Sequence, residues 1–353
     1  AIPAPDSGRK IMAQMAGRNI VQQVKDGIRP SKILTKAIFE NAIKINAAIG
    51  GSTNFAIHLL AIAGRVGIDL QLNDIDRCSA DIPLLANLQP SGQYFMEDFY
   101  YAGGLPALIK ELMPRLNASV LTVNQKSYWE NYQNSECFNY SVIATLKEPF
   151  NPLSGIVVLK GNLCPNGAVI KPSAASKHLL KHQGKAVVFE DIDDYKKRID
   201  DPDLEIDENS VMVLKHVGLK GYPGMPEVGN MGLPPKLLAK GITDMVRISD
   251  GRMSGTGFGT VVLHISPEAA DGGLLALVQN GDEIILDVAN KKLELLVDEG
   301  EIKRRKERYV PFKSPYNRGY VHLFANHVLQ PEEGADLDFL KGNSGYGVPR
   351  DSH

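Results

Sequence analysis

The chain has 353 residues, 43% of them hydrophobic and 23% charged, which is the composition of an ordinary globular protein. A formal net charge of -2 with scattered Lys and Arg excludes a basic face that could neutralise a run of phosphates, so nucleic acid is not an expected partner. The sequence shows no apolar run near the roughly 20 residues that span a bilayer and opens on no signal-peptide pattern, so we expect no membrane association.

The chain is longer than one typical domain, and the first of two expected domains, residues 1–150, is predicted to be mostly helical. A first helix is ended by Gly27 and Pro30, and Ser31 is placed to cap a second. A third, apolar helix is predicted from Phe55 to Val66, and the stretch Ser119 to Val123 is predicted as a strand. The apolar positions of the first helix are Met12, Ala16, Ile20 and Val24.

Small and polar residues lead into the third helix, in the run AAIGGSTN from Ala47 to Asn54. The free N–H groups at a helix N-terminus suit a carboxylate or a phosphate. Ser52, Thr53 and Asn54 are therefore candidate substrate-binding residues. The alternative is that Ser52 or Thr53 simply caps the helix.

Residues 151–353 are predicted to form a second domain, because short β-rich runs recur there between turns. Pro165-Asn166-Gly167 and Asn280-Gly281-Asp282 are turn signals, and one charged helix, Asp191–Asp200, is inserted. The pattern favours a closed or half-closed β-barrel. The predicted strands are Ile156–Leu159, Ala186–Phe189, Val211–Leu214, Met245–Ile248, Thr260–Ile265, Glu283–Val288 and Leu293–Val297.

Two glycine-rich loops between Lys220 and Ser266 carry the candidate chemistry. The first, KGYPGMPEVGNMG, presents Glu227, and the second, DGRMSGTGFG, presents Ser254. One carboxylate on a stiff turn is consistent with a Mg²⁺ ligand, because Mg²⁺ takes few protein ligands and keeps several waters. The alternative is an ordinary exposed glutamate of a loop.

Ser254 matches neither of two familiar glycine-rich motifs. Gly251 lies three residues before it rather than two, which excludes the nucleophile elbow of the α/β-hydrolases, and a serine hydrolase has no other motif support. Thr260 stands where the dinucleotide fingerprint needs its last glycine. Ser254 is then either a turn residue or a base activated by a metal, since a metal lowers the pKa of bound water from 15.7 to about 7.

The cysteines give no metal-binding pattern. Cys78, Cys137 and Cys164 are an odd number at wide, irregular spacing, which argues against a disulfide framework and favours a reducing, cytoplasmic setting. Their apolar, turn or polar-connection surroundings are not those of iron–sulfur ligands, so we expect no cluster on these three residues.

With these loops in view, the chain resembles the dihydroxy-acid/sugar-acid dehydratase family, and within it the aldonic-acid enzymes such as L-arabinonate and D-xylonate dehydratases. The similarity runs from the first residues to the C-terminal DSH and rests on long motifs. They are AIGGSTNFAIHLLAIA, LANLQPSGQYFMEDFYYAGGLPAL, LKGNLCPNGAVIKPSAAS, KGYPGMPEVGNMGLPP and RISDGRMSGTGFGTVVLHISPEAADGG.

The resemblance implies an α/β fold, with the remainder of an N-terminal α/β domain followed by a C-terminal β-barrel domain. It also implies dehydration of a 2,3-dihydroxy sugar acid to a 2-keto-3-deoxy acid by a homo-oligomer, a dimer or tetramer, that uses a [2Fe–2S] cluster and Mg²⁺. In that scheme Mg²⁺ binds the substrate carboxylate and the cluster is the Lewis acid for the 3-hydroxyl. The resemblance makes Ser254 the alkoxide base, places Thr256 beside it as a second catalytic residue, and makes Glu227 a magnesium ligand.

The chain also departs from the family. The cluster cysteines and most of the magnesium ligands of the family lie in an N-terminal portion without a counterpart here, so we expect a C-terminal part that is inactive by itself. The sequence AIPAPDSGRK opens without Met, which agrees with a fragment. Two alternatives stay open: a truncated, non-catalytic paralogue that serves as a binding or interface subunit, and a branched-chain dihydroxy-acid dehydratase.

Overall fold

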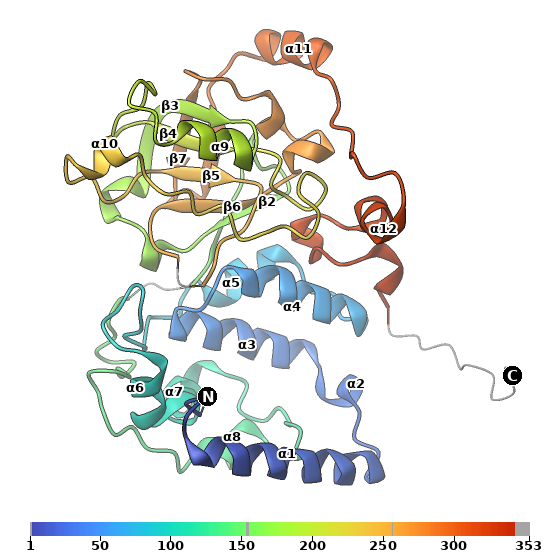
Figure 1. Cartoon of the computed structure of the whole chain (residues 1–353). Helices are drawn as coiled ribbons and strands as arrows, with labels where there is room; N and C mark the ends of the chain where they lie inside the picture. Colours follow the sequence, from blue (N-terminus) through green and yellow to red (C-terminus); the bar gives the residue numbers. More distant parts are fainter. Residues whose placement is uncertain (1, 153–154, 256, 343–353) are drawn as a thin grey trace, which may run out of the picture.

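A computed structural model describes residues 2–152, 155–255 and 257–342 and shows two stacked layers, one of helices and one built on a β-sheet (Figure 1). The chain is therefore of mixed α and β structure, as predicted. Within the described ranges, every helix is too short or too polar to cross a membrane. The helices of the first layer are α1 (Ser7–Lys25), α2 (Pro30–Ile33), α3 (Lys36–Ile49), α4 (Asn54–Arg65), α5 (Leu72–Ser79), α6 (Met96–Tyr101), α7 (Gly104–Leu112) and α8 (Tyr128–Tyr132).

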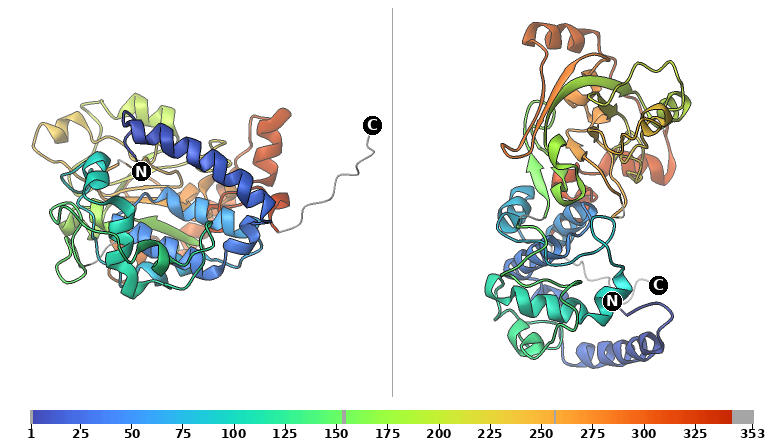
Figure 2. Two further views of the ribbon diagram at one scale, coloured as in Figure 1. Left: turned by 90° about the horizontal axis from the view of Figure 1, so that it is seen from below. Right: turned by 90° about the vertical axis from the view of Figure 1, so that its left-hand side faces the viewer.

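Helix α1 begins at its cap, Asp6, whose carboxylate accepts a hydrogen bond from the N–H of Gly8 at 2.7 Å. The helix is predicted correctly, but none of its residues is buried, and Val24 is 72% exposed. The views in Figure 2 show it lying along the outside of the helical layer. Its apolar positions therefore contribute little to the core of the described structure.

Two local predictions for this layer are wrong. The second helix is interrupted at Leu34, whose backbone is extended, and Thr35 rather than Ser31 caps the longer part, accepting from the N–H of Ile38 at 3.4 Å. The stretch Ser119–Val123 is not a strand, since it makes only an isolated bridge from Leu121 to Ser127. A tight turn, in which the N–H of Gln125 donates to the carbonyl of Thr122 at 2.9 Å, folds the chain back before a strand can form.

The second layer is a mixed eight-stranded sheet in the order β1-β2-β6-β5-β4-β3-β7-β8. Strands β3, β4, β5 and β6 run parallel, and the other pairs are antiparallel. Four helices belong to this half: α9 (Ile192–Arg198), α10 (Pro235–Leu238), α11 (Glu299–Arg308) and α12 (Gly319–His327). The strands are β1 (Val157–Leu159), β2 (Gly167–Ile170), β3 (Lys181–Phe189), β4 (Val211–Leu214), β5 (Arg247–Ser249), β6 (Val261–Ser266), β7 (Glu283–Asp287) and β8 (Lys292–Leu295).

The sheet curls until its two edge strands nearly meet. The N–H of Lys160, just after β1, donates to the carbonyl of Lys291 at 2.8 Å, and the N–H of Leu293 donates to the carbonyl of Lys160 at 2.9 Å. This nearly closed barrel confirms the barrel-like sheet predicted from the sequence. Its interior is filled by apolar side chains from the strands, among them Leu159, Ile170, Val188, Val213, Ile248, Val262, Ile284 and Leu293.

The outer side of the barrel packs on the helical layer. Because side chains alternate along a strand, Val158, Val169 and Leu263 point away from the barrel interior, and they share one hydrophobic cluster with Phe39 of α3 and Leu60 of α4. Each such buried side chain contributes roughly 1.5–3 kcal/mol to folding. This apolar seam holds the start of α4 against the loops that follow the central strands.

Candidate active site

The loops that carry Glu227 and Ser254 leave the barrel side by side. Strands β4 and β5 are parallel neighbours, with Leu214 opposite Ser249, so their carboxyl ends lie at the same edge of the sheet. The glutamate loop, residues 215–234, follows β4, and the serine loop, residues 250–260, follows β5. The N–H of Gly229 donates to the carbonyl of Arg252 at 2.9 Å, which joins the two loops directly.

The start of α4 completes this group. The side-chain amide of Asn54 donates to Oε1 of Glu227 at 2.5 Å and to the carbonyl of Met253 at 3.0 Å. A Cβ atom on Gly255 would lie 3.1 Å from the Cβ of Ser52, so glycine lets the serine loop rest against this residue. Three segments far apart in the sequence therefore meet at one place, and both Glu227 and Ser254 are exposed there.

The predicted substrate-binding residues differ in their surroundings. The Ser52 hydroxyl accepts a hydrogen bond from the N–H of Asn54 at 3.2 Å, as expected if Ser52 caps the helix rather than binding substrate. Thr53 makes no capping bond; it is 1% exposed, and its hydroxyl, like Oδ1 of Asn54, is buried with no hydrogen-bond partner in the described structure. Such orphaned oxygen atoms indicate a missing ligand or water. Thr256 lies outside the described residues.

These groups fit Mg²⁺ in kind. Mg²⁺ binds oxygen atoms and needs only one or two carboxylates from the protein, and Glu227, in contact with the amide of Asn54, supplies that type of donor. Among the residues that the structure describes, no three His, Cys, Asp or Glu side chains converge where they would hold a metal ion. Glu227 would therefore be one ligand of several.

The cysteines do not fit an iron–sulfur cluster. Cys164 is fully buried in the barrel interior, Cys78 lies in the seam between barrel and helices, and Cys137 borders a third apolar cluster around α7. Burial raises the pKa of the Cys164 thiol to about 12, which opposes the thiolate form that ligates iron. The three thiols lie in or beside three different hydrophobic clusters, and the two buried ones, Cys78 and Cys164, lie among apolar side chains.

Lys171 is a residue of this region that the sequence analysis missed. It follows β2, is 4% exposed, and its ammonium donates to the carbonyl of Gly50 at 2.5 Å, directly before the Gly51-Ser52 step that meets the serine loop. It thus ties the barrel to the turn that begins α4. The sequence signal was a lysine directly after the apolar run Gly167–Ile170 in the motif LKGNLCPNGAVIKPSAAS; the structure shows that this run is a buried strand.

The buried amine gives a pH-dependent prediction. Burial lowers the pKa of Lys171 from 10.5 to about 8, so the unfolded chain holds more protons between these two pH values. The free energy of unfolding of the wild type should therefore rise with pH across that window by about 3 kcal/mol relative to Lys171→Met. Urea unfolding at several pH values measures it. The exposed Lys177→Met is the control, and parallel pH profiles for wild type and Lys171→Met would contradict the prediction.

The far end of the serine loop is held by a buried ion pair. Asp244 accepts from the N–H and the hydroxyl of Thr260, at 2.9 and 2.7 Å, and from Nη2 of Arg247 at 2.9 Å. Burial opposes its charge, but these bonds together keep the pKa of Asp244 below the ordinary 3.8. Gly259, with φ +119, lies so close that a Cβ atom would come within 1.7 Å of Arg247 Nη2. The end of the loop is therefore fixed by packing and charge together.

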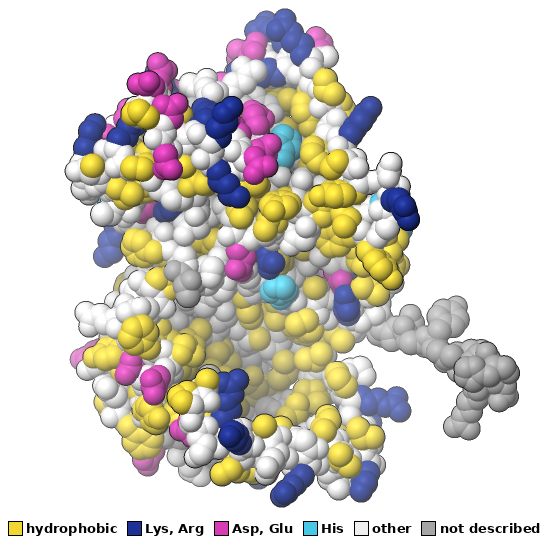
Figure 3. All heavy atoms as spheres, in the orientation of Figure 1, with side chains coloured by type: hydrophobic (Ala, Val, Ile, Leu, Met, Phe, Trp, Pro, Cys, Tyr) yellow, Lys and Arg dark blue, Asp and Glu magenta, His cyan; other side chains and the backbone are white. Residues whose placement is uncertain are grey.

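A hollow of about 350 Å³ lies along α4 beside the two loops, and its lining mixes apolar and charged residues. Basic side chains come from His58, Arg65 and Arg252, although Arg65 is engaged with Asp336 at 2.7 Å. The face drawn in Figure 3 likewise shows histidine and charged side chains of both signs at the waist between the layers. This space suits part of a small polar molecule.

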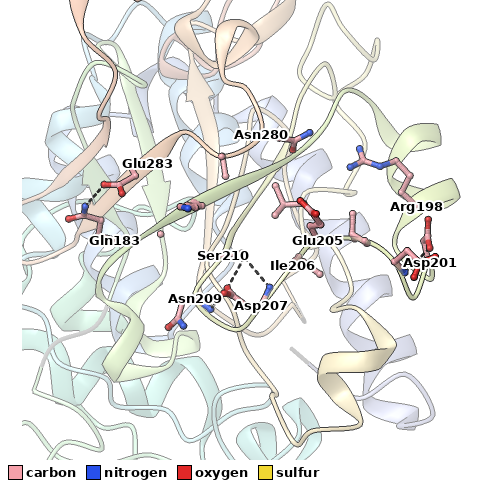
Figure 4. A pocket seen from close by; sticks show the side chains of 17 residues that line it. Gln183, Arg198, Asp201, Glu205, Ile206, Asp207, Asn209, Ser210, Asn280 and Glu283 are labelled. Atoms are coloured by element: carbon pink, nitrogen blue, oxygen red, sulfur yellow. Dashed lines mark hydrogen bonds between the residues drawn. The ribbon is translucent and has the colours of Figure 1, made fainter.

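The larger hollow shown in Figure 4, of about 1050 Å³, lies elsewhere. It is lined by the first half of β3 and by residues 201–210, which precede β4, so it sits at the opposite end of the parallel strands from the two loops. Two of its hydrogen bonds, from Gln183 to Glu283 at 2.6 Å and from Ser210 to Asp207 at 2.8 Å, join pairs of its own lining residues. Size alone does not identify the candidate site.

Comparison with known proteins supplies the family context. Residues 1–131 match the family described as dihydroxy-acid/6-phosphogluconate dehydratase N-terminal, and residues 141–335 match its C-terminal counterpart. The whole chain is 59% identical over 355 residues to a Rhizobium leguminosarum protein named L-arabinonate dehydratase, covering 61% of that protein.

Two further relatives extend this comparison. An Azospirillum brasilense protein named L-arabonate dehydratase is 54% identical over the whole chain, which covers 62% of it. A Caulobacter vibrioides protein named D-xylonate dehydratase is 40% identical over 96% of the chain, which covers 59% of it. The chain thus spans about three fifths of the length of these relatives.

Proposed function

Because the chain belongs to the dihydroxy-acid/6-phosphogluconate dehydratase family, we propose that its protein is a hydro-lyase that converts a sugar acid to a 2-keto-3-deoxy acid. The observation that carries the proposal is the meeting of the Glu227 loop, the Ser254 loop and the start of α4 around the Asn54–Glu227 hydrogen bond. A carboxylate that suits a metal and an exposed hydroxyl then face one small substrate.

The reaction needs a base at C2 and loss of the hydroxyl at C3. Ser254 takes the C2 proton, the C3–O bond breaks, and the hydroxyl leaves as water once a proton has been supplied to it. The enol that remains tautomerises to the ketone. A serine hydroxyl is a weak base unless a nearby charge stabilises its alkoxide, so the site must hold positive charge.

Glu227 would hold Mg²⁺, with Asn54 orienting the carboxylate through its 2.5 Å hydrogen bond. When bound, Mg²⁺ would supply positive charge that offsets the substrate carboxylate and favours deprotonation nearby. The positive end of the α4 helix dipole adds a second, weaker preference for an anion. The [2Fe–2S] cluster stays an implication of the family resemblance, because the cysteines described in this chain do not fit it.

The names of the similar proteins support a five-carbon aldonate as substrate, L-arabinonate or D-xylonate. The hollow beside the loops has both apolar and charged lining residues, so the preference for an aldonate over a branched-chain dihydroxy acid rests on the names of the similar proteins. Assembly into a homo-oligomer stays a prediction.

The test is an assay of the full-length protein, with iron, acid-labile sulfide and Mg²⁺ contents determined beforehand. L-Arabinonate, D-xylonate and a branched-chain 2,3-dihydroxy acid are compared, and the 2-keto acid product is trapped as its semicarbazone. We expect the highest kcat/KM with an aldonate. A preference for the branched-chain acid would change the substrate class, and a cluster-loaded protein that forms no keto acid from any of them would refute the hydro-lyase proposal.

A further inference from the structure

Two carboxylates lie fully buried directly behind the candidate site. Asp250 is the first residue of the serine loop, and Glu268 follows β6 in the segment ISPEAADGG. Both are 0% exposed. The sequence analysis quoted this segment without assigning a role to either acid, and the proposed reaction uses neither of them directly.

Glu268 holds the first turn of the glutamate loop. Both of its carboxylate oxygens accept from the N–H of Lys220 at 3.0 Å, and Oε2 also accepts from the N–H of Gly221 at 3.2 Å. Gln330 completes the arrangement, since its amide donates to Oε1 at 2.9 Å and its carbonyl accepts from the N–H of Glu268 at 3.0 Å. The first turn of the glutamate loop is therefore held by hydrogen bonds to the Glu268 carboxyl group.

Asp250 joins this support to the serine loop. Its Oδ1 accepts from the N–H of Val217 at 3.0 Å, and its Oδ2 accepts from the N–H of Ala269, the neighbour of Glu268, at 2.9 Å. One short side chain thus contacts the root of the glutamate loop and the segment that holds it. The two carboxylates and their backbone partners form a continuous brace between the loops of Glu227 and Ser254.

Two glycines permit this close approach. A Cβ atom on Gly218 would lie 2.4 Å from Oε2 of Glu268, and one on Gly251 would lie 2.9 Å from Cγ2 of Val217. Any side chain at these positions would displace the carboxylate or separate the loop roots. The two glycines, the packing around them and the hydrogen bonds therefore all favour one fixed distance between the first residues of the two loops.

The brace is costly to the fold. Burial and, to a smaller extent, the charge of Asp250 together raise the pKa of Glu268 to about 7, and burial raises the pKa of Asp250 to about 6. Two neighbouring buried acids lower the stability of the folded protein, and buried ionisable groups of this kind are concentrated at functional sites. Backbone anchoring by itself would not require two acids.

We propose that Asp250 and Glu268 are positioning residues that set the glutamate loop against the serine loop, so that Glu227 and Ser254 address the same substrate. The inference rests on the proposed function, in which Glu227 binds a divalent cation. Neither acid touches the reacting atoms; both act through the backbone of residues 217–221. The competing explanation is that the pair only stabilises the barrel.

The experiment measures binding of Mn²⁺, as a probe of the Mg²⁺ site, to full-length protein by electron paramagnetic resonance. Four variants are compared with the wild type: Glu268→Gln, Gln330→Ala, Glu227→Gln, and the exposed control Glu307→Gln on α11. Circular dichroism and the thermal midpoint are recorded for each. Supporting residues of a metal site typically change its affinity about 10- to 100-fold, and we expect that weakening in Glu268→Gln and no change in Glu307→Gln.

The outcomes separate the two proposals. A weakened Mn²⁺ affinity in Glu227→Gln with an unchanged one in folded Glu268→Gln would overturn the brace and leave the proposed function standing. An affinity unchanged in Glu227→Gln would remove the metal role on which both rest. If Glu268→Gln does not fold, Gln330→Ala provides the test. This variant removes the two hydrogen bonds that the Gln330 side chain makes with Glu268 and leaves the Glu268 carboxyl group in place. We expect its Mn²⁺ affinity to fall about threefold or more. Wild-type affinity in that variant would overturn the brace.

Discussion

Replacing Ser254 by alanine in the full-length protein is expected to lower kcat for aldonate dehydration by about 100- to 10,000-fold, the usual contribution of a positioned base. The substitution removes one exposed oxygen atom and leaves the hydrogen bond between the N–H of Gly257 and the backbone carbonyl of residue 254 available. KM should change little, because the hydroxyl acts on the C2 proton rather than on the groups that bind the substrate.

A second measurement assigns the loss to proton transfer. In deuterated water, the wild type should introduce solvent deuterium into the substrate or product only through the proton-transfer steps of turnover. The rate of this deuterium incorporation should fall in parallel with kcat in Ser254→Ala. Ser141→Ala, which changes an exposed serine of the helical layer, is the matched control and should keep full activity. Activity of Ser254→Ala within tenfold of the wild type would show that another group is the base.

Replacing Asp244 by alanine is expected to lower the free energy of unfolding by about 3–5 kcal/mol, because it leaves the buried Arg247 without its counter-charge. The N–H and the hydroxyl of Thr260 would lose their acceptor at the same time. Urea unfolding followed by circular dichroism measures the change. The serine loop ends at these residues, so activity should fall with stability rather than independently of it.

The pH dependence of this effect has a defined sign. The pKa of Asp244 in the folded protein is lower than its ordinary 3.8, so its stabilising effect is present above that pH and is lost as the pH falls through the folded pKa. The exposed Asp203→Ala should stay within about 0.5 kcal/mol of the wild type throughout. A loss for Asp244→Ala as small as that of Asp203→Ala would contradict the account of a buried, paired charge.

Most of the barrel could be predicted from the sequence because its strands are short apolar runs between turn signals. The run Val211–Leu214, for example, is fully buried and coincides with β4. The strand β2 was missed because its four residues begin with Gly167, which reads as part of a turn. The first half of β3, from Lys181 to Lys185, was missed because it is polar and pairs only on its antiparallel side with β7.

The candidate site was predictable only in part. Glu227 and Ser254 were named from their loops and the family resemblance, but the hydrogen bond between Asn54 and Glu227 joins residues 173 positions apart and has no local signal. The role of Glu268 was likewise hidden, since an acid next to a proline reads as a surface turn. Its burial depends on Gln330, a residue that only the folded chain brings near.

The parallel placement of β4 and β5 has a consequence for protein engineering. Their two loops share one exit from the barrel and touch through Gly229 and Arg252, whereas the β7–β8 hairpin takes no part in that contact. To transfer the substrate preference of a relative to this protein, residues 215–234 and 250–260 should therefore be exchanged together. Exchanging one loop alone would pair two contact surfaces from different proteins. Exchanging both together would keep their contact matched and leave the barrel strands unchanged.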